Sequence, residues 1–343
     1  MSPAARSATA FAAPARPVGT RRLPVRSAPD LDARRARARE LGHRIGTILD
    51  DADAVAEQLH GALVELSDEP YRRELARVAP GIEHAIGVRS PLVRALAAGI
   101  RPALRQARPA EALWIAERLS HEESLESRQL ALEFLRRSLP ADPERTWQLM
   151  RRLGRRASDW ISIDSLAFLV AEGILREPFR WAEIEQLVYA ESVWERRLAA
   201  ATIAVLRSTS RGLVANRAIS TTIGPVEVGR GLTVIGSLIG DADPNVSKAL
   251  SWALRELTPV DRAQVTAFVR TQAGRAAAER DGNRAWVLRD ALAKLDPEDA
   301  AAIRTQLAGV RRAAGESSTS TAAEVAGRFG RLPDPRSLPE PPL

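Results

Sequence analysis

Cysteine is absent from the 343-residue chain. Its absence excludes disulfides, thiolate metal sites and cysteine nucleophiles. The four histidines are scattered, and none has a metal-ligand spacing such as HExxH. We therefore expect no metal and no cofactor. No apolar run approaches the length of a membrane span, so we expect no membrane partner and a cytoplasmic location.

Lysine is nearly absent as well. Lys248 and Lys294 are the only lysines among 50 basic residues, and the formal net charge is +7. Two interpretations of this balance remain open. The arginine bias of a GC-rich genome produces it without any functional pressure. Alternatively, clustered arginines bind a polyanion and displace counterions from its phosphates.

Aromatic residues are scarce at 4% of the chain, yet seven of them are tryptophans, so their placement is informative. Hydrophobic residues make up 45% and charged residues 27%, which is typical of a globular protein. Alanine, leucine and arginine fill the middle of the chain, and all three favour helices.

The two ends differ in composition from the rest. Residues 1–29 contain five arginines and no acidic residue, which indicates a disordered basic arm or, alternatively, an organellar transit peptide. Residues 315–343 are rich in serine and threonine and then in proline, and we expect a disordered tail. The segment between them, 30–314, is expected to form one helical domain.

Helices follow one another through that domain. Ser90-Pro91 and Asp142-Pro143 each look like an N-cap followed by proline at the first helical position. No segment alternates convincingly as a strand would, and 221–239 is the most ambiguous. Apolar residues recur at helical spacing in four segments: 126–138, 160–175, 194–207 and 246–257.

A 34-residue repeat is visible in the middle of the chain. Ser124, Ser158 and Ser192 are separated by this interval, and so are Trp160 and Trp194. Repeats of this length, built as helix pairs, stack into a solenoid with an extended concave surface. The next tryptophan, Trp252, comes 24 residues late. We therefore predict a loop insertion at about 208–231.

Two spacings bring polar and aromatic side chains to common helix faces. Trp160 and Asp164 are four residues apart, and Trp194 and Arg197 are three apart, so each pair shares one face. If neighbouring helices stack in register, indole edges, a carboxylate and a guanidinium line one groove. Such a groove suits a ligand that is both flat and charged.

These residues resemble the AlkD-like DNA alkylation repair family, glycosylases that remove alkylated purines and are built from HEAT-like repeats. The resemblance runs from about residue 87 to about 295. It depends on Trp160-x-x-x-Asp164, on Trp194-x-x-Arg197 and on the segment from Lys248 to Glu256 that contains Trp252. The fold it implies is an all-α HEAT-like helical-repeat solenoid, curved, with a concave basic groove.

The resemblance also implies roles. Asp164 would be the catalytic carboxylate, and Arg197 would lie beside it, holding it in place or binding a phosphate. Trp160 and Trp252 would cradle the damaged nucleotide. In the same segment as Trp252, we expect Lys248 and Arg255 to bind DNA. The implied partner is double-stranded alkylated DNA, bound by a monomer.

The chain departs from the family pattern on both sides of the first tryptophan. Family members often have a second tryptophan just before it and an aspartate just after it, whereas this chain has Asp159 and Ile161. The expected insertion and the N-terminal arm are further differences. They bear on lesion preference more than on the fold.

The chemistry of alkylated purines fits this set of residues. A purine alkylated at N3 or N7 is cationic and leaves readily, and the sugar becomes oxocarbenium-like as the bond breaks. A carboxylate near C1′ in a shielded site stabilises that charge. The predicted function is metal-independent hydrolysis of the glycosidic bond. The alternative is a non-catalytic helical-repeat scaffold that binds nucleic acid or protein.

Structural interpretations remain beside the functional ones. Trp160 can be a core residue behind an N-cap at Ser158 or Asp159, and Asp164 can form an ordinary salt bridge with Arg197. Trp194 is expected in the core. Four other tryptophans are assigned to packing: Trp114, Trp147, Trp181 and Trp286. Four arginines before the Trp160 helix either bind phosphate or lie on a solvated surface: Arg151, Arg152, Arg155 and Arg156.

Overall fold

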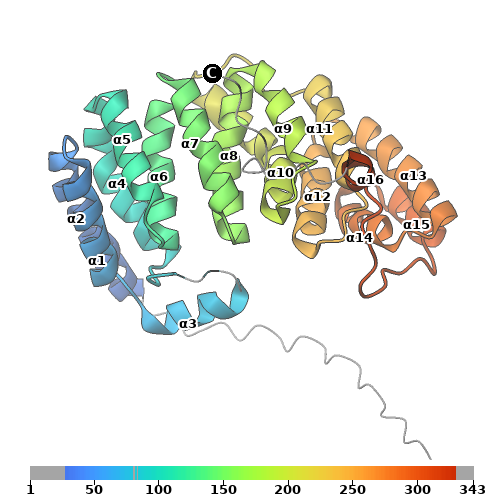
Figure 1. Ribbon diagram of the computed structural model, residues 1–343, viewed down its shortest axis with the longest axis horizontal. Helices are drawn as coiled ribbons and strands as arrows, with labels where there is room; N and C mark the ends of the chain where they lie inside the picture. The colour runs from blue at the N-terminus through green and yellow to red at the C-terminus, as the bar shows by residue number, and fades with distance from the viewer. Residues whose placement is uncertain (1–27, 80–81, 83, 330–343) are drawn as a thin grey trace, which may run out of the picture.

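The computed structural model describes residues 28–79, 82 and 84–329, and this part of the chain is all-helical with no strand. The fold is a curved α-solenoid (Figure 1). The helices are α1 (Ala28–Ile45), α2 (Ala52–Glu65), α3 (Glu69–Val78), α4 (Ser90–Gln106), α5 (Pro109–Ser120), α6 (Leu125–Ser138), α7 (Pro143–Arg156), α8 (Trp160–Arg176), α9 (Trp181–Leu187), α10 (Val193–Ala215), α11 (Pro225–Leu238), α12 (Pro244–Leu257), α13 (Arg262–Glu279), α14 (Gly282–Ala291), α15 (Pro297–Gln306) and α16 (Thr321–Phe329). Three short 3-10 helices, η1 (Gly46–Ile48), η2 (Pro178–Arg180) and η3 (Leu292–Lys294), join them.

Two layers of helices build the solenoid. One layer runs α1, α4, α6, α8, α10, α12 and α14, each packed against the next, while helices such as α5, α7, α11 and α13 form the second layer. In Figure 1 the layers follow an arch, with α10, α12 and α14 toward its inside and α11 and α13 toward its outside. A continuous core of buried aliphatic side chains lies between the layers.

The four helices expected from apolar spacing are confirmed as α6, α8, α10 and α12. Asp142 is an N-cap, since its carboxylate accepts a hydrogen bond from the backbone N–H of Arg145. The prediction of a Ser90 cap is wrong: Arg89 is the N-cap of α4, and Ser90 is already helical. In the 34-residue series, Ser124 and Ser192 are N-caps, whereas Ser158 precedes the N-cap Asp159.

The loop predicted at 208–231 is wrong at both ends. Residues 208–215 continue α10, and residues 225–231 belong to α11, so only 216–224 connect the two helices. The Ser208 and Ser210 hydroxyls donate to carbonyl oxygens one turn back, which accommodates serine inside a helix. Gly231 serves close packing, because a Cβ there would lie 3.0 Å from the Ile203 side chain.

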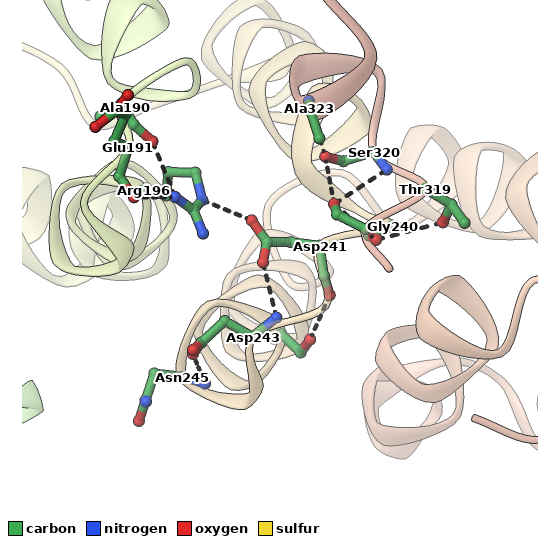
Figure 2. Close-up of polar contacts among 12 residues, drawn as sticks. Ala190, Glu191, Arg196, Gly240, Asp241, Asp243, Asn245, Thr319, Ser320 and Ala323 are labelled. Atoms are coloured by element: carbon green, nitrogen blue, oxygen red, sulfur yellow. Dashed lines mark hydrogen bonds and ion pairs between the residues drawn. The ribbon is translucent and has the colours of Figure 1, made fainter. Parts of the chain in front are cut away.

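The tail predicted from residue 315 also differs in part. Residues 321–329 form α16, and the segment before it folds back onto the α11–α12 turn. Thr319 donates its backbone N–H to the Gly240 carbonyl oxygen at 2.9 Å (Figure 2) and its hydroxyl to an Asp281 carboxylate oxygen at 2.6 Å. Residues 330–343 and residues 1–27 of the expected arm lie outside the described residues, and α1 begins at Ala28.

Candidate active site

The site begins at the first turn of α8. Asp159 is fully buried and caps this helix, accepting hydrogen bonds from the Ser162 backbone N–H and hydroxyl, both at 2.7 Å. Arg128 of α6 adds a contact of 3.3 Å to the same carboxylate. Ile161 packs against a small apolar cluster that includes Leu75 of α3. The two departures from the family pattern therefore serve local structure, as a helix cap and as a packing residue.

Helix α8 has two distinct faces beyond its cap. Ile163, Leu166 and Val170 are buried in the core. Trp160 and Asp164 lie on another face, where they line a cavity. The Trp160 side chain is 36% exposed, so it is not a core residue. The spacing argument is thus right that the indole and the carboxylate share one face.

Asp164 and Arg197 form a bidentate ion pair between α8 and α10. Arg197 Nε lies 3.0 Å from Asp164 Oδ1, and Nη2 lies 2.7 Å from Oδ2. The third guanidinium nitrogen, Nη1, donates to the Asn245 carbonyl oxygen of α12 at 2.6 Å. The Arg197 side chain is only 7% exposed and that of Asp164 is 20% exposed. The guanidinium is therefore immobilised by two helices, while the carboxylate remains accessible.

Burial raises the pKa of Asp164 above the ordinary value of an aspartate. The hydrogen bonds and the charge of Arg197 act in the opposite direction, and the nearby Asp159 carboxylate adds a smaller upward contribution to the pKa. Arg197 therefore limits the cost of keeping a desolvated carboxylate ionised.

The cavity that Asp164 lines has a volume of about 450 Å³ and lies between α4, α6 and α8. Trp160 and Asp164 contribute to it from α8, together with Ser165 and Phe168. The tryptophan and the carboxylate thus face a space large enough to admit part of a nucleic acid.

The remaining predicted DNA-binding residues lie on α12. Lys248 is exposed, and Trp252 is half-buried against the core. Arg255 is paired with Asp290 of α14, and it also donates to the Asp290 carbonyl oxygen at 3.0 Å. Trp252 follows Asn245 by seven residues, which is two helical turns or about 10 Å. The hydrogen bond from Arg197 to the Asn245 carbonyl oxygen connects α12 to the Asp164–Arg197 pair.

Tryptophan assignments are confirmed at most positions. Trp147 and Trp181 are buried, and Trp194 and Trp286 are half-buried against the core. The assignment of Trp114 to packing is wrong, because its side chain is 63% exposed. Helix α5 buries Ala112, Ile115, Ala116 and Leu119, and position 114 points away from that stripe.

The four arginines near the C-terminal end of α7 that were considered for phosphate binding all contact neighbouring helices or turns. Arg151 pairs with Glu183 at 2.8 Å, and Arg155 approaches Glu195 at 3.7 Å. Arg152 pairs with Glu117, and Arg156 donates to the Ser120 carbonyl oxygen. These side chains therefore link adjacent repeats.

Two site residues escaped the sequence reasoning. Asn245 acts through its backbone carbonyl, which no residue type reveals. Phe168 lies four residues after Asp164 and lines the same cavity. The four-residue spacing that joined Trp160 to Asp164 extends to Phe168 and is the signal that could have found it.

Neither a metal site nor a membrane span is present in the described part of the chain. No group of three or more potential ligands among those residues could hold a metal ion. No described helix combines the length and apolarity needed to cross a membrane.

Comparison with known proteins gives a family match. A family model described as DNA alkylation repair enzyme matches residues 59–295. No curated protein sequence matches the chain. The matched segment begins in α2, ends just after η3, and contains the whole candidate site.

Proposed function

Because the chain belongs to the DNA alkylation repair enzyme family, we propose that it is a DNA glycosylase. It hydrolyses the N-glycosidic bond of purines carrying a cationic N3- or N7-alkyl modification in double-stranded DNA. It acts as a cytoplasmic monomer without metal or cofactor. The observation that carries the proposal is an accessible carboxylate, Asp164, fixed by Arg197 on the wall of an open cavity.

Asp164 supplies negative potential where positive charge develops. As the bond from C1′ to the base nitrogen breaks, its electron pair goes to the base, which leaves uncharged. The sugar becomes oxocarbenium-like, and the nearby carboxylate stabilises it. Asp164 also orients the attacking water, whose oxygen bonds to C1′ and whose proton passes to the carboxylate and then to solvent.

Arg197 is best assigned as the residue that positions Asp164. Its three guanidinium nitrogens all donate to protein oxygens, and its side chain is almost wholly buried. A phosphate would have to displace one of these contacts. The alternative role as a phosphate ligand is therefore the weaker one.

Aromatic and cationic residues complete the proposed interface. Trp160 and Trp252 offer electron-rich faces to the cationic nucleotide, an attraction of about 0.5–2 kcal/mol each. Exposed Lys248 contacts a backbone phosphate. Arg255 contacts the backbone more weakly, because it shares its charge with Asp290.

The test is base release by Asp164→Asn. We expect this variant to bind methylated duplex DNA nearly as well as the unmodified protein and to release 7-methylguanine about 100-fold more slowly or worse. Free base is measured by chromatography under single-turnover conditions. Asp296→Asn is the matched control. Asp296 also forms an ion pair with an arginine, Arg262, but that pair is exposed and Asp296 lies just beyond the family match.

Two results would contradict the proposal. Undiminished base release by Asp164→Asn would remove the carboxylate from the mechanism. DNA binding by the unmodified protein without any base release would favour the scaffold alternative, in which the Asp164–Arg197 pair only ties α8 to α10.

A further inference from the structure

An exposed aromatic side chain lies one turn beyond the proposed catalytic carboxylate. Phe168 follows Asp164 by four residues on α8, and its side chain is 40% exposed. The residues on either side of it, Ala167 and Leu169, are completely buried. Trp160, Asp164 and Phe168 therefore form a stripe along one face of the helix, with the carboxylate between two accessible rings.

Phe168 lines the cavity together with an arginine that has no acidic partner among the described residues. Arg94 of α4 is exposed, and no described residue forms an ion pair with it. The other arginine of the cavity wall, Arg136, pairs with Glu133 at 3.3 Å. Glu133 is held more closely by Arg101, at 3.0 Å. The Glu133 charge is thus already matched, which leaves the Arg94 guanidinium available to an anion.

An apolar ring and a cation on one cavity wall complement a nucleotide. The ring packs against a base or a deoxyribose, and base–aromatic stacking tolerates any sequence because every base has a π-face. The guanidinium binds a phosphate. Phe168 is about 6 Å from Asp164 along the helix axis. This exceeds the axial step of about 3.4 Å between neighbouring nucleotides in a strand, so a strand that follows α8 would bring the nucleotide next to the one at Asp164 within reach of Phe168.

We propose that Phe168 and Arg94 form a subsite for the nucleotide next to the lesion on the same strand. Phe168 packs against the base or sugar of that nucleotide, and Arg94 binds its phosphate. The proposal rests on the proposed glycosylase function, which places the lesion at Asp164. The subsite holds the strand in register, so that C1′ of the damaged nucleotide stays beside the carboxylate.

The test removes the neighbouring nucleotide from the DNA as well as the ring from the protein. Three duplexes each carry one 7-methylguanine: an intact one, one whose lesion strand lacks the 5′ neighbour, and one lacking the 3′ neighbour. Both kcat/KM for base release and Kd are measured. For the unmodified protein, one of the two gaps is expected to lower kcat/KM about tenfold. Phe168→Ala should lose about as much on the intact duplex and be insensitive to that gap.

Further variants separate a nucleotide contact from a structural effect. Phe168→Trp keeps an aromatic face and should restore sensitivity to the gap. Arg94→Gln should weaken binding of the intact duplex. It should weaken binding of the duplex with the sensitive gap only when that gap carries a terminal phosphate. Phe179→Ala is the matched control, because Phe179 is 67% exposed and lies in η2, away from the residues of the cavity.

The outcomes distinguish this subsite from the glycosylase function. A loss by Phe168→Ala that is the same on all three duplexes would overturn the subsite, and so would no loss at all. Absence of base release by the unmodified protein would contradict the glycosylase function alone. The Kd values for the three duplexes would then still decide whether Phe168 contacts a neighbouring nucleotide.

Discussion

At the scale of single residues, Arg197 sets the charge state of Asp164. Burial raises the pKa of that carboxyl, and the guanidinium counteracts the rise. Because the sugar cation is stabilised by the ionised form, base release should fall as pH drops through this raised pKa. The acid limb of the rate should therefore lie above the ordinary aspartate value of about 3.9. For stability the direction is opposite: the stabilising contribution of the protonated carboxyl is present at low pH and is lost as pH rises through its folded pKa.

Arg197→Gln removes the influence that lowers the pKa of Asp164. We expect the acid limb of single-turnover base release to move to higher pH, with a slower rate at neutral pH. Asp159, whose charge raises the same pKa, is unchanged in this variant, as are the cavity-wall groups Arg94, Glu133 and Arg136. The measurement is a pH–rate profile, with Arg176→Gln as control because Arg176 pairs with Glu172 at the far end of α8. An acid limb that does not move would rule out this role of Arg197.

Residue types and spacing predicted part of this site. The intervals from Trp160 to Asp164 and from Trp194 to Arg197 placed the carboxylate and the guanidinium on helix faces that the structure brings together. The Asn245 contact was not predictable, because it involves a backbone oxygen from a helix 48 positions further along the chain. The exposure of Trp114 and Phe168 was missed because aromatic residue types favour burial, whereas the orientation of the helix decides whether a particular side chain is exposed.

At the scale of elements, two signals were misleading. The late position of Trp252 suggested a loop at 208–231, and serine and threonine content suggested a tail from 315, although α10, α11 and α16 occupy much of both. Inside α10 the serine hydroxyls bond to the helix itself. In the C-terminal segment they bond to Gly240 and Asp281, partners far away in sequence. Helix existence followed from local apolar periodicity, but these distant partners have no local signature.

The returning C-terminal segment should stabilise the last repeats. Gly240 leaves no room for a side chain, since a Cβ there would lie 2.3 Å from Thr319 Oγ1 and 2.7 Å from the Ser320 backbone nitrogen. Gly240→Ala should therefore displace the segment shown in Figure 2 and cost about 1–3 kcal/mol of unfolding free energy. The measurement is thermal unfolding, where we expect Tm to fall by a few degrees.

Gly236→Ala on α11 is the matched control for that substitution. A Cβ at Gly236 would meet Phe268 at 3.5 Å, an ordinary contact, and alanine favours a helix interior more than glycine does. This variant should keep or slightly raise Tm. Equal unfolding temperatures for the two variants would show that the segment contributes nothing to stability.

At the scale of the whole molecule, the excess of arginine had two explanations, genome composition and a polyanion partner. Many arginines form ion pairs between helices, as Arg151 does with Glu183 and Arg230 with Glu185. Such ion pairs link neighbouring helices, and the glutamate of each pair neutralises the charge of its arginine. Overall net charge therefore says little about DNA binding, and the informative cations are those exposed on the inner layer.

The two lysines provide a matched pair for testing this distinction, since both are exposed. Lys248 lies on α12, in the proposed interface, and Lys294 lies in η3, outside it. Each phosphate contact adds about 0.9 to the slope of log affinity against log salt concentration. Lys248→Gln should weaken duplex binding and reduce that slope by about 0.9, and Lys294→Gln should change neither. Filter binding or fluorescence anisotropy from low to moderate salt measures both slopes. Equal slopes for the two variants would mean that α12 does not contact the phosphates, and that any electrostatic attraction comes from arginines elsewhere on the arch.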